Sequence, residues 1–205
     1  MSAQEAPRQR MFNVPTVTKW LLVANVAIFA VTATLPDATS DAIVGVLGFS
    51  SARYHGGFHL AALFDPITYQ FLHGGIEHIA VNMLGLVAFG AGVEQRLGPW
   101  RFLAFYLVCG VIGAFAELAI DPHSTDLMIG ASASISGLFG AILRFGAFRR
   151  TFWTLVAAWL VLNAVTGIAG VGSEGVPVAW VAHVGGFLAG LVLYPLLVRP
   201  AYAGK

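Results

Sequence analysis

The chain has 205 residues, of which 58% are hydrophobic and only 10% are charged, and its mean hydropathy is +0.79. Soluble domains average about 25% charged residues, so this composition excludes an ordinary water-soluble domain. The formal net charge is +1 and no basic run is present, so nothing in the sequence indicates binding to nucleic acid. The composition therefore predicts an integral membrane protein whose main partner is the lipid bilayer.

Six apolar segments are candidates for transmembrane helices, which need about 17 to 25 mostly apolar residues. In chain order they cover residues 20–35, 74–93, 100–118, 127–143, 151–170 and 178–198. The longest loop separates the first two segments, and its apolar stretches "AIVGVLGF" and "FHLAALF" are too short to span. They predict helices that lie in the membrane interface. We expect one membrane domain over residues 15–198, with tails at 1–14 and 199–205.

The distribution of basic residues predicts how the chain is oriented, because cytoplasmic loops are enriched in Lys and Arg. Placing both termini in the cytoplasm puts ten of the 11 Lys and Arg residues on that side and leaves only Arg53 outside. The sequence thus predicts an all-α membrane protein of six helices with both termini cytoplasmic.

Several glycines recur at spacings that suit helix packing, because small residues let transmembrane backbones approach closely. The pairs are Gly110 with Gly113, Gly137 with Gly140, and Gly186 with Gly190. The fourth and sixth segments each carry such a face, and we expect them to be neighbours.

Four polar side chains lie at a similar depth, near the starts of the second, fourth and sixth segments: His78, Asn82, Ser132 and His183. Polar groups inside a membrane are costly and tend to face a cavity or a partner. A serine nucleophile needs a base within hydrogen-bond reach, so Ser132 and His183 form the predicted pair. We expect a dyad without a third, orienting carboxylate.

His78 and Asn82 are four residues apart, which places them on one face of a helix. Both can donate hydrogen bonds to an oxyanion that develops during acyl transfer. The backbone amide of Ser132 can join them, because the first N–H groups of a helix have no intrahelical partner.

Four stretches of the chain resemble the rhomboid family of intramembrane serine proteases: "ITYQFLHGGIEHIAVNMLGL", "GVEQRLGPWRF", "GASASISGLFGA" and "AHVGGFLAG". The resemblance implies a six-helix bundle with a water-filled cavity open to the outer side. It implies that Ser132 is the nucleophile, that His183 is the general base, and that His78 and Asn82 line the oxyanion hole. It also implies that His73 supports the site. The expected substrates are membrane proteins cleaved in or near a transmembrane segment.

The chain departs from the family pattern Gly-x-Ser-Gly, because Ala133 follows Ser132. A partial match further on offers Ser136 as a second candidate nucleophile, one turn deeper. The departure keeps open a catalytically inactive relative that binds transmembrane segments. The Trp-Arg pair often seen in the family's first loop is also missing.

Other classes of membrane protein fit the sequence less well. The zinc proteases need His-Glu-x-x-His, which is absent, and every Asp lies in a loop, which argues against an aspartyl protease. A small-solute transporter would predict inverted repeats, and none is visible. We expect no metal and no cofactor. The compact six-span form resembles bacterial members, which predicts a bacterial plasma membrane.

Overall fold

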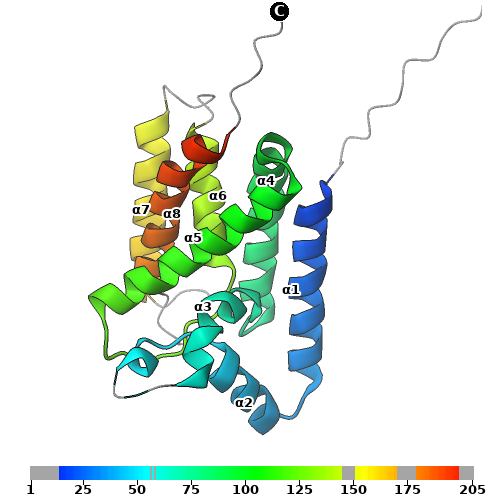
Figure 1. The fold of residues 1–205 in the computed structure, drawn as a ribbon, viewed down its shortest axis with the longest axis vertical. Coiled ribbons are helices and arrows are strands. Elements are labelled where there is room, and N and C mark those ends of the chain that lie inside the picture. The colour runs from blue at the N-terminus through cyan, green and yellow to red at the C-terminus, as the bar shows by residue number, and fades with distance from the viewer. Residues whose placement is uncertain (1–13, 56, 58, 145–150, 170–178, 199–205) are drawn as a thin grey trace, which may run out of the picture.

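The computed structural model describes residues 14–55, 57, 59–144, 151–169 and 179–198. Within these ranges the chain is helical, and the one isolated β-bridge joins Phe49 to Met128 (Figure 1). The predicted all-α class is therefore confirmed for the part of the chain that the structure describes.

Each of the six predicted segments overlaps one long helix of the described residues. These helices are α1 (Thr16–Thr34), α4 (Ile76–Leu97), α5 (Pro99–Ile120), α6 (Ser132–Arg144), α7 (Phe152–Ala169) and α8 (Trp180–Leu197). Among the described residues, four of them are long and apolar enough to cross a membrane, namely α1, α4, α5 and α8. In α7 the apolar stretch covers Phe152–Val165. The protein is an integral membrane protein.

Helix α6 begins five residues later than predicted, at Ser132 instead of Leu127. Met128 and Phe49 exchange two backbone hydrogen bonds of 2.8 and 3.0 Å, so the chain is extended there. Gly130 then adopts a φ of +117°, which is strained for any residue with a side chain, and its N–H donates to the Tyr69 carbonyl at 2.9 Å. Thirteen residues rise about 20 Å, less than the hydrocarbon core of about 30 Å.

The long first loop folds into short elements at one end of the bundle (Figure 1). The stretch "AIVGVLGF" lies mostly in a helix as predicted, whereas in "FHLAALF" the described residues 59–64 form a 3₁₀ turn in place of the predicted helix. The elements are α2 (Asp37–Leu47), η1 (Ser51–Tyr54), η2 (Leu60–Leu63), α3 (Asp65–Thr68) and η3 (Tyr69–Phe71).

Arg53, the one basic residue assigned to the outer side, is neutralised inside this loop. Its guanidinium lies 2.8 Å from the buried Asp65 carboxylate and also donates to the carbonyls of Gly45 and Gly48. The Tyr54 hydroxyl donates to the other carboxylate oxygen at 2.7 Å. A charge held in this way does not conflict with the predicted orientation.

The tightest packing joins α6 to α8, as the glycine spacings predicted. A methyl group added at Gly186 would overlap the Ala133 carbonyl, and one added at Gly190 would overlap the Gly137 carbonyl. The two backbones are therefore in direct contact, which only residues without a side chain allow. Helix α5 packs against the same pair.

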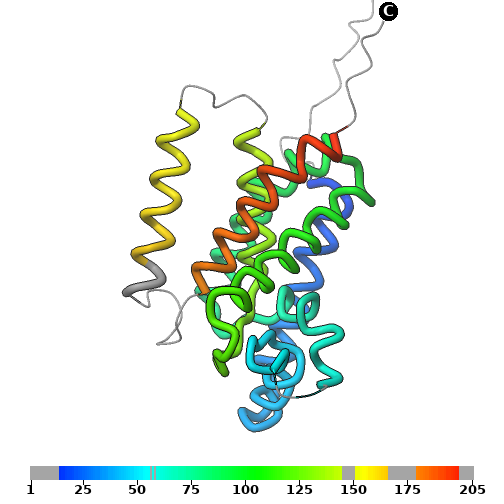
Figure 2. Tube along the Cα trace, turned by 60° about the vertical axis from the view of Figure 1, so that its left-hand side comes forward, coloured from blue at the N-terminus to red at the C-terminus, as the bar shows by residue number. Residues whose placement is uncertain are grey.

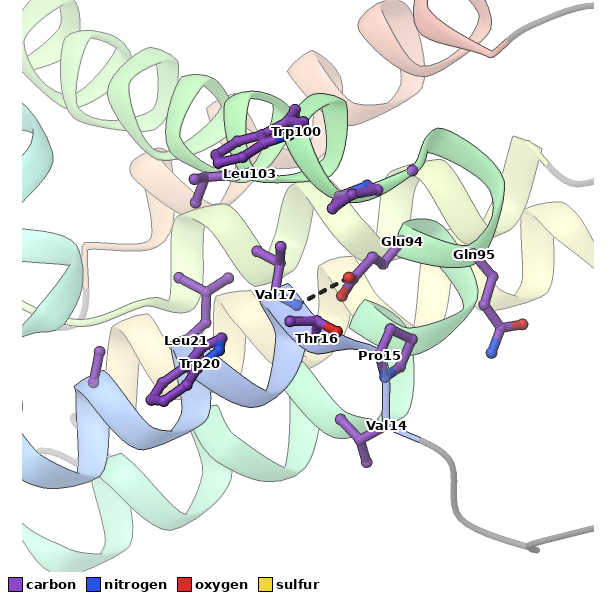
Figure 3. Close-up of a pocket in the computed structure, with 13 residues that line it drawn as sticks. Val14, Pro15, Thr16, Val17, Trp20, Leu21, Glu94, Gln95, Trp100 and Leu103 are labelled. Atoms are coloured by element: carbon purple, nitrogen blue, oxygen red, sulfur yellow. Dashed lines mark hydrogen bonds between the residues drawn. The ribbon is translucent and has the colours of Figure 1, made fainter.

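A buried carboxylate attaches α1 to the rest of the bundle. Glu94 of α4 accepts a hydrogen bond from the Val17 N–H at 2.9 Å (Figure 3). It also accepts hydrogen bonds from the Thr18 N–H and the Thr18 hydroxyl, each at 2.7 Å. These amides belong to the first turn of α1, where N–H groups have no intrahelical partner and a negative charge is favourable. A groove of about 940 Å³ runs beside this contact, with Trp20 and Trp100 in its wall.

Replacing Glu94 with alanine is expected to destabilise the fold by about 2 kcal/mol or more, because it leaves buried donors unpaired. The measurement is thermal unfolding in detergent, followed by circular dichroism. Gln95→Ala is the matched control, since the Gln95 side chain is exposed one residue further along α4. Equal unfolding temperatures for the two variants would contradict the structural role given to Glu94.

Candidate active site

The structure brings Ser132 and His183 together. Ser132 is the first residue of α6, and His183 lies in the first turn of α8. The His183 Nε2 and Ser132 Oγ atoms are 2.7 Å apart, which is a hydrogen bond. The contact follows from the α6–α8 packing, because the close approach at Gly186 lies one turn after His183. This is the arrangement of an activated hydroxyl nucleophile and its base.

His78 and Asn82 face the turn that leads into Ser132. A methyl group at Gly130 would lie 2.6 Å from His78 Nε2 and 3.8 Å from Asn82 Nδ2, so both side chains cover that backbone. The Gly74 N–H donates a long hydrogen bond of 3.5 Å to His78 Nδ1. Because Nδ1 is the acceptor, the imidazole proton lies on Nε2, which is the nitrogen that faces Gly130. Asn82 Nδ2 also donates to the His78 carbonyl at 2.9 Å.

His73 lies beside this group in the loop before α4. Its ring meets the His78 ring edge to face, with 5.0 Å between the ring centroids. Burial, and then the nearby His78, lower the pKa of His73 to about 4. His73 is therefore neutral at physiological pH, and its ring packs against the His78 ring.

The other two serines of the stretch "GASASISGLFGA", Ser134 and Ser136, are buried in α6. Ser134 is buried, and its hydroxyl donates to Gln70 Oε1 at 2.8 Å, which ties α6 to the first loop. Ser136 is also buried, and the serine that contacts His183 is Ser132. The geometry therefore favours Ser132 over Ser136 as the candidate nucleophile.

Ala133, which stands where the family pattern has glycine, packs against a glycine of a neighbouring helix. A methyl group added at Gly113 of α5 would lie 2.8 Å from the Ala133 Cβ atom. The absence of a side chain at Gly113 therefore leaves room for the Ala133 methyl group. Ala133 is buried and lies within α6. The departure from the pattern does not displace Ser132 from His183.

Two polar residues near the pair were not singled out from the sequence. Asn163 of α7 places its Oδ1 atom 2.6 Å from His183 Nδ1 and is only 6% exposed. Glu117 of α5 accepts a hydrogen bond of 3.2 Å from the Ala182 N–H, one residue before His183. A polar side chain in an apolar segment is a signal of function, and both residues carry that signal.

In the part of the chain that the structure describes, no three His, Cys, Asp or Glu side chains lie close enough together to hold a metal ion. The contact between the Ser132 hydroxyl and the His183 imidazole is an arrangement that can support acyl transfer.

Comparison with known proteins gives the class. A family model described as the rhomboid domain matches residues 60–200. The chain is 33% identical over 145 residues to "Rhomboid protease GluP" of Bacillus subtilis (strain 168), covering 67% of this chain and 26% of that protein. It is 33% identical over 147 residues to "RHOMBOID-like protein 5" of Arabidopsis thaliana, covering 66% of this chain and 45% of that protein. A third relative, "RHOMBOID-like protein 4" of the same plant, is 27% identical over 215 residues, covering 92% of this chain and 54% of that protein.

The apolar helices and these matches define a helical membrane protein. The chain belongs to the rhomboid family, as the sequence motifs predicted. It spans between about a quarter and about half the length of these three relatives.

Proposed function

We propose that the protein is an intramembrane serine endopeptidase that hydrolyses peptide bonds in or near transmembrane segments of other membrane proteins. The single observation that carries this proposal is the 2.7 Å contact between Ser132 Oγ and His183 Nε2 at the adjoining starts of α6 and α8. The proposal includes the topology of six spans with both termini cytoplasmic, in a bacterial plasma membrane. It also includes a membrane domain over residues 15–198 between tails at 1–14 and 199–205.

The reaction follows from the roles of the two residues. Ser132 Oγ attacks the scissile carbonyl carbon while His183 Nε2 takes the hydroxyl proton. His183 then returns that proton to the leaving amine, and an acyl-enzyme remains on Ser132. Water hydrolyses the ester, with His183 again acting as the base, and releases the second product. No cofactor takes part.

The negative charge of the tetrahedral intermediate falls on the former carbonyl oxygen. His78 Nε2, Asn82 Nδ2 and the Ser132 amide are the proposed donors to it, with His73 supporting the His78 ring. Their common position around Gly130 supports this assignment. Removing one such donor from a soluble protease costs about 2.7–4 kcal/mol, so the three groups would be a major part of the catalytic effect.

A rhomboid relative that binds transmembrane segments without cleaving them is the second candidate. The observation that favours it is the Ala133 departure from the family pattern. The packing of the Ala133 methyl against Gly113 weighs against it. Labelling of the nucleophile separates the two candidates.

A fluorophosphonate probe is expected to label the detergent-purified wild-type protein and the Ser136→Ala variant, and not the Ser132→Ala variant. The reason is that the imidazole of His183 contacts the hydroxyl of Ser132. Labelling is read by in-gel fluorescence, and Ser136→Ala is the matched control because it removes a buried hydroxyl from the same helix.

Two other labelling results would contradict this expectation. An unlabelled wild-type protein, folded by circular dichroism and treated in parallel with an active rhomboid protease, would favour the non-cleaving relative. Labelling that disappears in Ser136→Ala instead would move the nucleophile to that residue.

A further inference from the structure

His183 is held by two side chains on opposite sides of its ring. Nε2 contacts Ser132 Oγ at 2.7 Å, and Nδ1 contacts Asn163 Oδ1 at 2.6 Å. The Asn163 amide nitrogen donates to the Trp159 carbonyl one turn back in α7, at 2.8 Å. Because Nδ2 must be the donor to a carbonyl, Oδ1 is the amide atom that faces His183.

This orientation of the amide determines where the imidazole proton lies. An amide oxygen only accepts hydrogen bonds, so the contact requires the proton on His183 Nδ1. Nε2 is then unprotonated and accepts the Ser132 hydroxyl proton, which is the form that a general base needs. A ring with the proton on Nε2 would face Ser132 with a donor and would leave Asn163 Oδ1 opposite a second acceptor.

We infer that Asn163 is a positioning residue that fixes the tautomer and ring orientation of His183. This inference rests on the proposed function, since it presupposes that His183 is the base. It extends the expected dyad to a three-residue chain, Ser132–His183–Asn163, in which the third member is an uncharged amide contributed by α7.

The way α7 is attached explains why Asn163 can act in this way. Trp159 stacks on Phe187 of α8, with 4.6 Å between ring centroids and 23° between ring planes. Much of the opposite face is exposed, including Val161 at 61% exposure. Figure 2 shows α7 at the edge of the bundle. Trp159 and Asn163 are one helical turn apart on α7. The aromatic stack therefore fixes the position of α7 along its axis at which the Asn163 amide contacts His183.

The first test reads the tautomer directly. The full chain, labelled with ¹⁵N-histidine in detergent micelles, is examined by ¹⁵N–¹H correlation through the imidazole ring, with the His183 signals assigned by their loss in His183→Ala. The wild-type ring is expected to carry its proton on Nδ1, and Asn163→Ala is expected to show a large fraction protonated on Nε2. A wild-type ring protonated on Nε2, or an Nδ1 proton unchanged in Asn163→Ala, would overturn the inference.

The second test reads catalysis with a transmembrane peptide in vesicles. Asn163→Ala is expected to lower kcat about 10- to 100-fold with KM within about twofold, since a misplaced base affects chemistry more than binding. Asn163→Asp retains an acceptor oxygen and is expected to restore kcat to within about fivefold of wild type. Val161→Ala, on the exposed face of α7, is the matched control and should match wild type.

The outcomes separate this inference from the proposed function. A wild-type protein that neither cleaves nor labels would contradict the protease proposal, while the tautomer measurement would still test Asn163. A kcat that is equally low in Asn163→Asp and Asn163→Ala would assign the residue a packing role and overturn the inference. If Asn163→Ala does not fold, the tautomer of His183 in the wild-type protein and the kcat of Asn163→Asp still test the inference.

Discussion

His183→Ala is expected to abolish cleavage, with kcat falling on the order of 10⁴- to 10⁶-fold. In a soluble serine protease the loss of the base alone costs about 2 × 10⁶ in kcat, because the nucleophile and base act as a unit. The proposed unit in this chain is the pair Ser132 and His183, which lie 2.7 Å apart. The measurement is single-turnover cleavage of a transmembrane peptide in vesicles, together with the rate of fluorophosphonate labelling.

The double variant Ser132→Ala/His183→Ala is expected to be no slower than either single variant, since two members of one unit are not additive. His59→Ala is the matched control, because it removes an exposed histidine from the first loop. Cleavage by His183→Ala at the wild-type rate would rule out the proposed mechanism.

Gly186→Ala is expected to have the second largest effect, on both stability and activity. Its new methyl group would overlap the Ala133 carbonyl, so α8 must move away from α6. Overpacking of this kind costs about 1–3 kcal/mol. A 1 Å displacement of the catalytic pair costs about 100-fold in rate, and Ala133 is bonded to Ser132. Thermal unfolding in detergent and the labelling rate measure the two effects.

Gly45→Ala gives the matched control for this substitution. Gly45 lies in α2, and a methyl group added there meets nothing within 4 Å. Alanine is the better helix former by about 1 kcal/mol, so this variant should be as stable as wild type or slightly more stable. Similar losses in Gly45→Ala and Gly186→Ala would contradict the close backbone contact between α6 and α8.

The approximate positions of the long helices that the structure describes could be predicted from apolar segment length, which is a local property. The neighbouring positions of α6 and α8 could be predicted as well, because glycine spacing records close helix packing. The start of α6 could not, since it depends on Met128 pairing with Phe49, 79 residues earlier in the chain. No local pattern near Leu127 reveals that pairing, and the apolar residues 127–131 are equally compatible with a helix.

The candidate site was partly predictable, because His78, Asn82, Ser132 and His183 lie at one depth in the expected topology. The depth argument covers only the segments that run from outside to inside in the expected topology, and Asn163 lies on the fifth segment, which runs the other way in that topology. The outer part of the fifth segment is then its C-terminal part, where Asn163 lies, so the same depth argument extends to this residue. The role of Asn163 as a partner of His183 needs the side-chain geometry.

The attachment of α7 differs in kind from the contact between α6 and α8. Ser132 and His183 lie on helices whose backbones touch, whereas α7 joins them through an aromatic stack and an amide. A helix held by side chains can move outward without separating two backbones, so we expect α7 to move more easily than α6 or α8. In the proposed protease, α7 would then be the helix whose outward movement admits a transmembrane segment, while Ser132 and His183 keep their contact.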